Sequence, residues 1–227
     1  GTYFNLKDSY NVPSSPSRED AIKAYGLLCD LFSDFNLEGD SHVTTVIAGV
    51  LTLLTQHAHE GNQPLIHLDA TDAGSGKSLI VDIITRVGSG QQAPSVSFTN
   101  DEAEQEKRIT SLLSSGNNIL SFDNLPNRGV FESSVIDSLI TKQYHQSRKL
   151  GSNSAGSTIN FKANITMFSN GNNISIGGDL KRRMLVARIT KSRDTGLRNY
   201  KHNWLASADA GELYAKYTTA ALTILRA

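Results

Sequence analysis

The segment Thr71–Ser78, TDAGSGKS, contains the residue types that hold a nucleotide phosphate. Gly74 and Gly76 permit positive φ angles and a close approach of the backbone to an anion. Lys77 can then reach the outer phosphates, and the Ser78 hydroxyl can ligate Mg²⁺. The segment departs from the usual G-x-x-x-x-G-K-S pattern at its first position. We predict an ATP site formed by all eight residues: Thr71, Asp72, Ala73, Gly74, Ser75, Gly76, Lys77 and Ser78.

A carboxylate that can hold the metal ends a later apolar run. Asp123 follows residues 118–122, NILSF, and lies 46 residues after Lys77, a separation that suits an adjacent metal-binding strand. The next residue is Asn124, where many hydrolysing ATPases have Glu. An amide can orient water but cannot accept its proton. Either turnover is slow, another carboxylate acts as the base, or the site is a binding switch.

Two further polar features complete the candidate catalytic set. Asn170 ends the run ITMFS, where it could contact the γ-phosphate or the attacking water, whereas Asn172 and Asn173 could equally be turn residues. Arg182 and Arg183 precede an apolar run, 12 and 13 residues after Asn170. An arginine near the γ-phosphate stabilises transition-state charge, and in oligomeric ATPases it often comes from the neighbouring subunit.

Apolar periodicity predicts the elements that must position these residues. Strands are expected at 65–68, 95–99, 118–122, 143–150, 157–161, 165–169 and 184–189. Helices are expected after the phosphate loop, from a cap at Thr99 or Asn100 to about Ser115, around 131–140, and over 212–226. Alternating strands and helices indicate an α/β fold of the P-loop NTPase type, with a mainly parallel sheet flanked by helices.

Two helices are expected before the phosphate loop. Ser17 with Asp20 three residues later is typical of a capped helix start, and a second helix begins at Asp40 or Ser41. We predict that they form an N-terminal helical collar. The expected domains are an arm and collar over 1–60 and an ATPase domain over 61–227.

Composition narrows the function classes. The chain has one cysteine and no apolar run long enough for a membrane span, so we expect a cytoplasmic protein without a disulfide or a membrane partner. The net charge is zero, but residues 1–141 hold 8 Lys/Arg against 18 Asp/Glu, whereas residues 142–201 hold 12 against 2. This asymmetry indicates an anion-binding face in the second segment. No histidine or cysteine spacing is typical of a zinc site.

In order and spacing, these elements resemble the superfamily 3 helicases of the AAA+ class, especially the helicase-like portion of virus-, phage- and plasmid-encoded primase-helicases. The resemblance covers about residues 64–227. It rests on GSGKS, ILSFDN, QYHQSRKLGSNSAGS, MFSNGNN, DLKRR and the terminal YTTAALTILRA. It implies that Lys77, Asp123 and Asn170 belong to the catalytic site and that Arg182 or Arg183 reaches the ATP of an adjacent subunit. Asn124, our remaining catalytic candidate, replaces the second acid that is usual in the family. The resemblance also implies that a β-hairpin over 143–161 grips DNA, with His145, Arg148, Lys149 and Lys162 on or near its strands.

The sequence therefore predicts an ATP-hydrolysing DNA helicase or translocase domain of a mobile-element replication protein. It would act as a homo-oligomeric ring, such as a hexamer, on single-stranded DNA with ATP and Mg²⁺. Two alternatives stay open. One is a nucleotide-dependent DNA-binding switch or loader with little hydrolysis, which Asn124 favours. The other is a P-loop small-molecule kinase, which predicts a monomer without affinity for DNA.

Overall fold

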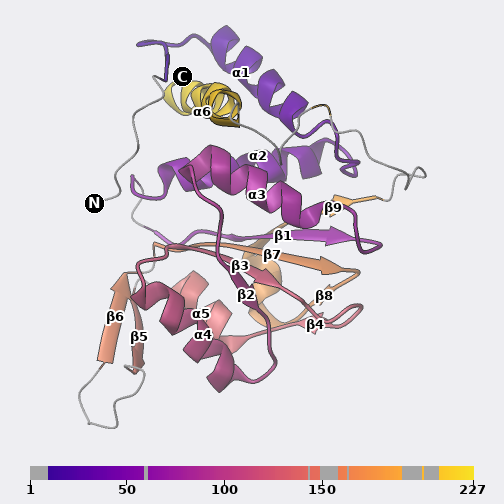
Figure 1. The fold of residues 1–227 in the computed structure, drawn as a ribbon, viewed down its shortest axis with the longest axis vertical. Coiled ribbons are helices and arrows are strands. Elements are labelled where there is room, and N and C mark those ends of the chain that lie inside the picture. The colour runs from indigo at the N-terminus through magenta and orange to yellow at the C-terminus, as the bar shows by residue number, and fades with distance from the viewer. Residues whose placement is uncertain are drawn as a thin grey trace.

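The computed structural model describes residues 10–58, 61–142, 144–148, 158–162, 164–190, 201 and 210–227 (Figure 1). Its helices are α1 (Arg18–Leu31), α2 (Asp40–Thr55), α3 (Lys77–Ser89), α4 (Glu102–Ser114), α5 (Ser134–Thr141) and α6 (Ala210–Arg226), with a 3₁₀ helix, η1, at Gly178–Arg182. Its strands are β1 (Leu65–Ala70), β2 (Ser95–Ser97), β3 (Ile119–Asp123), β4 (Val130–Phe131), β5 (Tyr144–Arg148), β6 (Thr158–Lys162), β7 (Thr166–Asn172), β8 (Ser175–Ile176) and β9 (Met184–Ile189).

Five strands form one parallel sheet in the order β2-β3-β7-β1-β9. The predicted mainly parallel sheet with helices on both faces is thus confirmed. One detail of the prediction was wrong: β3 is not adjacent to β1, because β7 lies between them. The carboxyl ends of parallel strands meet at one edge, so the segments that follow β1, β3 and β7 lie together.

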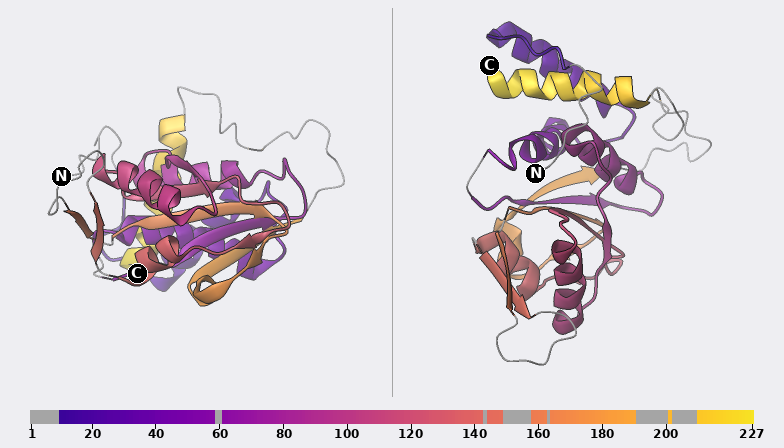
Figure 2. Two further views of the ribbon diagram at one scale, coloured as in Figure 1. Left: turned by 90° about the horizontal axis from the view of Figure 1, so that it is seen from below. Right: turned by 60° about the vertical axis from the view of Figure 1, so that its left-hand side comes forward.

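Helices cover the two faces of the sheet in separate hydrophobic cores. The core on one face joins α1, α2, α3 and α6 to alternate residues of β1 such as Ile66 and Leu68. The core on the other face joins α4 and α5 to Leu65, Phe122 and Met167. Figures 1 and 2 show these layers above and below the sheet. The alternation along β1 has the period of two that a strand buried on both faces requires.

Most predicted element boundaries agree with the structure to within a few residues, and three helix starts differ. Helix α6 begins at Ala210 rather than at residue 212. Ser17 caps α1 through a reciprocal capping box with Asp20, as predicted. The N-cap of α4 is Asp101 rather than Thr99 or Asn100, since the Asp101 carboxylate accepts the Glu104 N–H. Helix α5 begins at Ser134, because Phe131 instead belongs to the short strand β4.

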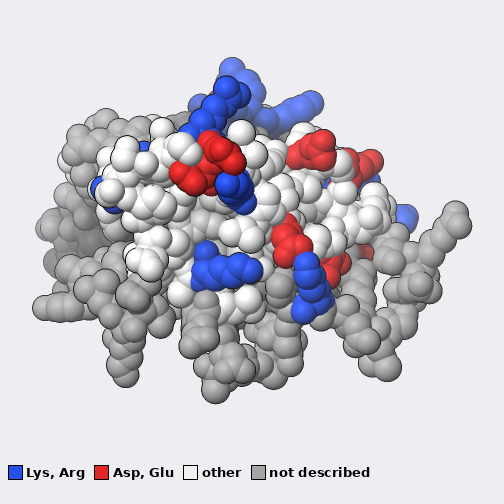
Figure 3. Space-filling view, turned by 90° about the horizontal axis from the view of Figure 1, so that it is seen from above, with Lys and Arg blue, Asp and Glu red and all other residues white. Residues whose placement is uncertain are grey.

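The two N-terminal helices pack into the body of the molecule. Helix α2 lies against α3 and β9, and α1 lies against the terminal helix α6 (Figure 2, right). Their role as a collar and the division at residue 60 stay predictions. On the side that α1 and α6 form, Lys/Arg and Asp/Glu side chains are interspersed among uncharged residues (Figure 3). None of the described helices is both long and apolar enough to cross a bilayer.

Candidate functional site

The Thr71–Ser78 loop connects the carboxyl end of β1 to the first residue of α3. Gly74 and Gly76 have φ angles of 73° and 96°, the positive values that glycine permits. Gly76 is the N-cap of α3, and no side chain caps that helix. The first N–H groups of a helix have no partner within that helix, so these donors and the positive end of the helix dipole coincide at the glycine turn. This geometry suits an anion.

Lys77 points back over the loop and is held by uncharged oxygens. Its Nζ donates to Asn172 Oδ1 at 2.7 Å, to Ser75 Oγ at 3.0 Å and to the Asp72 carbonyl at 3.4 Å. Burial lowers the pKa of Lys77, while the nearby Asp69, Asp123 and Asp72 carboxylates act in the opposite direction. Hydrogen bonds to neutral oxygens contribute little net free energy, so Lys77 can exchange them for a bond to a phosphate oxygen at modest cost.

Asp123 ends β3 on the same edge of the sheet and is near enough to Lys77 to influence its pKa. Its Oδ1 accepts the N–H of Asn124, which is exposed and has a φ of 58°. Ser78, at the start of α3, is also exposed. One hydroxyl and one carboxylate are hard oxygen donors of the kind Mg²⁺ accepts alongside waters and phosphates. Within the described residues, no group of three His, Cys, Asp or Glu could hold a metal alone.

The structure places Asn170 and Asn172 on the same side of β7, two residues apart. Asn170 is buried and pairs in register with Leu68 of β1, whereas Asn172 pairs with Ala70 at the strand end. It is Asn172, not Asn170, that contacts Lys77. The sequence analysis left Asn172 as a possible turn residue. Residues two apart in a strand face the same side, so the spacing from Asn170 could have identified Asn172 as a second residue of the site.

Arg182 and Arg183 lie at the opposite edge of the sheet, before β9. The register Leu65–Met184 and Ala70–Ile189 puts them one strand length, about 20 Å, from the Thr71–Ser78 loop. The Arg182 side chain is 75% exposed and pairs with Asp179 at 2.5 Å. The Arg183 side chain is 28% exposed and pairs with Asp137 of α5 and, at 3.5 Å, with Asp179. Neither arginine can therefore serve the loop of its own chain in this arrangement.

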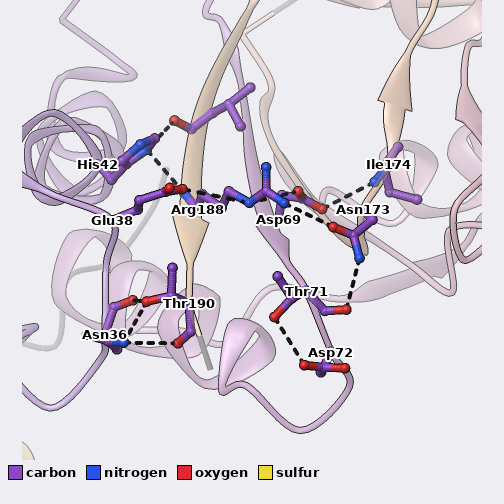
Figure 4. Close-up of polar contacts among 11 residues, drawn as sticks. Asn36, Glu38, His42, Asp69, Thr71, Asp72, Asn173, Ile174, Arg188 and Thr190 are labelled. Atoms are coloured by element: carbon purple, nitrogen blue, oxygen red, sulfur yellow. Dashed lines mark hydrogen bonds and ion pairs between the residues drawn. The ribbon is translucent and has the colours of Figure 1, made fainter. Parts of the chain in front are cut away.

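Charged and polar residues that the sequence analysis missed lie beneath the loop, inside two otherwise apolar strands. Asp69 of β1 accepts the Ile174 N–H at 3.3 Å and faces Arg188 of β9 at 3.8 Å (Figure 4). A charge within a buried strand requires a partner. The runs HLDA and MLVARI each contain one charged residue among apolar ones, but the sequence of either run does not identify the partner of that charge.

His67 lies two residues before Asp69 and is 1% exposed. Its Nδ1 is 2.8 Å from Ser169 Oγ, and its ring stacks on Phe131 at 6.3 Å. Burial lowers the pKa of His67 to about 4; Lys77 acts in the same direction and Asp69 opposes it. The imidazole is therefore neutral at pH 7.

Acid is expected to destabilise the protein through His67. The folded pKa lies below the ordinary value of 6.5, so the unfolded chain binds more protons between pH 6.5 and 4. The free energy of unfolding should fall by on the order of 3 kcal/mol as the pH drops through this window. Urea unfolding at a series of pH values measures it, with His67→Gln as the comparison. An equally steep slope in His67→Gln would assign the acid sensitivity to other groups.

The predicted hairpin is present as the antiparallel pair β5–β6, in which Tyr144 is opposite Lys162 and Arg148 is opposite Thr158. The side chains of Arg148 and Lys162, and all of Lys149 and the hairpin tip, lie outside the described part. At the hairpin base, a groove of about 620 Å³ is bordered by β5, α4 and α5. Its lining includes Glu106, Ser134, Ser138, Lys142, Tyr144 and Gln146.

Two contacts fix the walls of this groove. The Glu102 carboxylate accepts the N–H groups of Ser134 and Val135 at 3.2 and 3.0 Å, which ties α4 to the start of α5. Buried Ser147 donates to Glu106 and accepts from Thr110, which ties β5 to α4. Tyr144, which is 63% exposed, lies beside these contacts at the hairpin base.

Comparisons with known proteins support the fold alone. No family model and no curated protein matches the sequence. Among solved structures, the apo A form of the NrS-1 C-terminal region matches with a TM-score of 0.52 and 14% identity, over 98% of this chain and 49% of that chain. A second structure, of residues 305–718 of the same region, matches at 12% identity over 94% and 46% of the chains, with a TM-score of 0.46 that is too low for an argument. This chain thus spans about half the length of the NrS-1 region.

Proposed function

We propose that this chain is a P-loop ATPase domain of the superfamily 3 helicase type, which binds ATP and Mg²⁺ and moves single-stranded DNA. The observation that carries the proposal is the Thr71–Ser78 loop. A buried parallel strand leads into two positive-φ glycines, an uncapped helix start and a lysine held by neutral oxygens. These are the parts that hold a triphosphate through main-chain amides and one ammonium group.

Strand β7 lies between β1 and β3, so its terminal Asn172 comes between the Thr71–Ser78 loop and Asp123 at the carboxyl edge of the sheet. In the proposed site, Lys77 leaves Asn172 for the outer phosphates, and Asn172 is freed to face the γ-phosphate or the water. Ser78 and Asp123 supply one hydroxyl and one carboxylate oxygen to Mg²⁺, which neutralises phosphate charge when bound. Asn124, exposed beside Asp123, orients water without accepting its proton. We therefore expect slow turnover without a further stimulus.

The hairpin base is the proposed contact with single-stranded DNA. Tyr144 offers an exposed aromatic face, and Ser138 and Gln146 offer hydrogen-bonding groups in the same groove. Lys142 supplies one positive charge for a phosphate, whereas Glu106, which accepts a hydrogen bond from Ser147, places one carboxylate in the same groove. Stacking on an aromatic ring with polar groups around it is how unpaired bases are held without strict sequence preference. Arg148, Lys149 and Lys162 remain the predicted backbone contacts of the hairpin.

ATP turnover measured with and without oligothymidine separates this proposal from its alternatives. A motor is expected to show turnover that rises with DNA and with protein concentration, since the arginine finger requires a ring. A switch or loader would bind both ligands without such a rise. A small-molecule kinase would stay monomeric and leave the oligonucleotide free.

Tyr144→Ala is expected to weaken oligothymidine binding by about tenfold, because one base–aromatic stack contributes roughly 1–3 kcal/mol. Fluorescence anisotropy of a labelled oligonucleotide measures the change. Tyr25→Ala is the matched control: Tyr25 is an exposed tyrosine on α1, on the opposite side of the sheet. Equal affinities of the two variants would remove the groove from the DNA path.

A further inference from the structure

Asn173, at the turn after β7, holds the entry of the Thr71–Ser78 loop. Its backbone N–H donates to the Ala70 carbonyl at 2.9 Å, and its side-chain Nδ2 donates to the Thr71 carbonyl at 3.0 Å. Its φ is 50°, in the left-handed region that asparagine tolerates better than other side chains. The position at which Thr71 replaces the usual glycine is therefore anchored from the neighbouring strand.

The direction of this amide is set by Arg188. The Arg188 Nη2 donates to Asn173 Oδ1 at 3.0 Å (Figure 4). A guanidinium group can only donate, so the oxygen of the amide must face Arg188 and its NH₂ must face Thr71. Without this donor the amide can flip, and its oxygen would then oppose the Thr71 carbonyl.

Acidic residues hold the Arg188 guanidinium in place. Its Nε is 3.8 Å from Asp69 Oδ2 and 3.7 Å from Glu38 Oε2. The other Asp69 oxygen accepts the N–H of Ile174. Asp69 therefore holds Ile174 directly and holds the preceding Asn173 through Arg188. Asn172, which precedes Asn173, holds Lys77.

We infer that Arg188 is a positioning residue of the nucleotide site, which acts through Asn173 on Thr71 and on the adjacent Asn172. The inference rests on the proposed function. Arg188 touches no part of the loop directly in the contacts described above. Its effect is to keep the loop entry and the Lys77 partner in the binding arrangement before ATP arrives, which lowers the ordering cost of binding.

The test is a double-mutant cycle on ATP affinity, with a fluorescent ATP analogue as the probe. Arg188→Met and Asn173→Gly are each expected to weaken binding by about fivefold, because ATP must then order a loop entry that is no longer held in the binding arrangement. The double variant should be no weaker than either single variant, because both remove the same connection. Arg188→Lys, which keeps a charged donor, should recover part of the affinity. Arg226→Met, an exposed arginine at the end of α6, is the control.

Amide hydrogen exchange supplies a readout that needs no nucleotide. Exchange in 71–76 should be faster in Arg188→Met than in wild type, with α1 unchanged. Unchanged exchange at the loop, or additive losses of affinity in the cycle, would overturn the inference while leaving the proposed function intact. A wild-type protein that binds no ATP would defeat the proposed function, and the exchange result would still decide whether Arg188 orders the loop.

Discussion

Lys77→Ala is expected to lose at least about 100-fold in ATP affinity, because a charge-assisted bond to a phosphate contributes roughly 3 kcal/mol. The loss should not be a folding defect. Lys77 is buried, its pKa is lowered by that burial, and its three hydrogen-bond partners are neutral oxygens. Isothermal titration with MgATP measures the affinity directly.

Thermal unfolding shows whether a titration without binding reflects the loss of the ATP site or a folding defect. Wild type should be stabilised by saturating ATP, whereas Lys77→Ala should melt normally alone and gain nothing from ATP. Lys181→Ala, an exposed lysine in η1, is the matched control and should keep the ATP-dependent stabilisation. Wild-type affinity in Lys77→Ala would end the assignment of this loop.

Arg182→Ala is expected to reduce turnover by about 10³-fold with ATP affinity unchanged, the effect of removing an arginine that acts only on the transition state. The structure separates the two predicted candidates. Arg182 is largely exposed, and among the described residues it pairs with Asp179 of its own 3₁₀ turn, so it is available to a neighbouring subunit. Arg183 joins the start of β9 to Asp137 of α5, which raises the pKa of Arg183. Arg183→Ala should therefore lower the melting temperature.

Mixing two inactive variants tests whether the arginine acts across a subunit boundary. Arg182→Ala and Lys77→Ala, each inactive alone, should recover about a quarter of wild-type turnover when combined in equal amounts, since one in four head-to-tail interfaces then has both intact groups. No recovery, with rings shown to mix, would contradict action in trans. A loss of turnover in Arg183→Ala at a temperature where it stays folded would return that residue to the candidates.

The local sequence determined the helices, the strands and the loop between β1 and α3. Each depends on neighbouring residues: the capping box of Ser17 and Asp20, the apolar run of β1, and the two glycines before Lys77. Such signals act within a few residues and need no knowledge of the rest of the chain. The fold class followed, because alternating strands and helices leave few ways to cover a sheet.

Only the tertiary structure decided which side chains meet. The order of the sheet inserts β7 between β1 and β3, and that order puts Asn172 rather than Asn170 on Lys77. Likewise, a buried aspartate in one strand indicates that a cation lies nearby. Only the adjacency of β1 and β9 identifies that cation as Arg188. Pairings of this kind join residues far apart in the chain, and they depend on the total burial of the two cores. No local pattern contains that information.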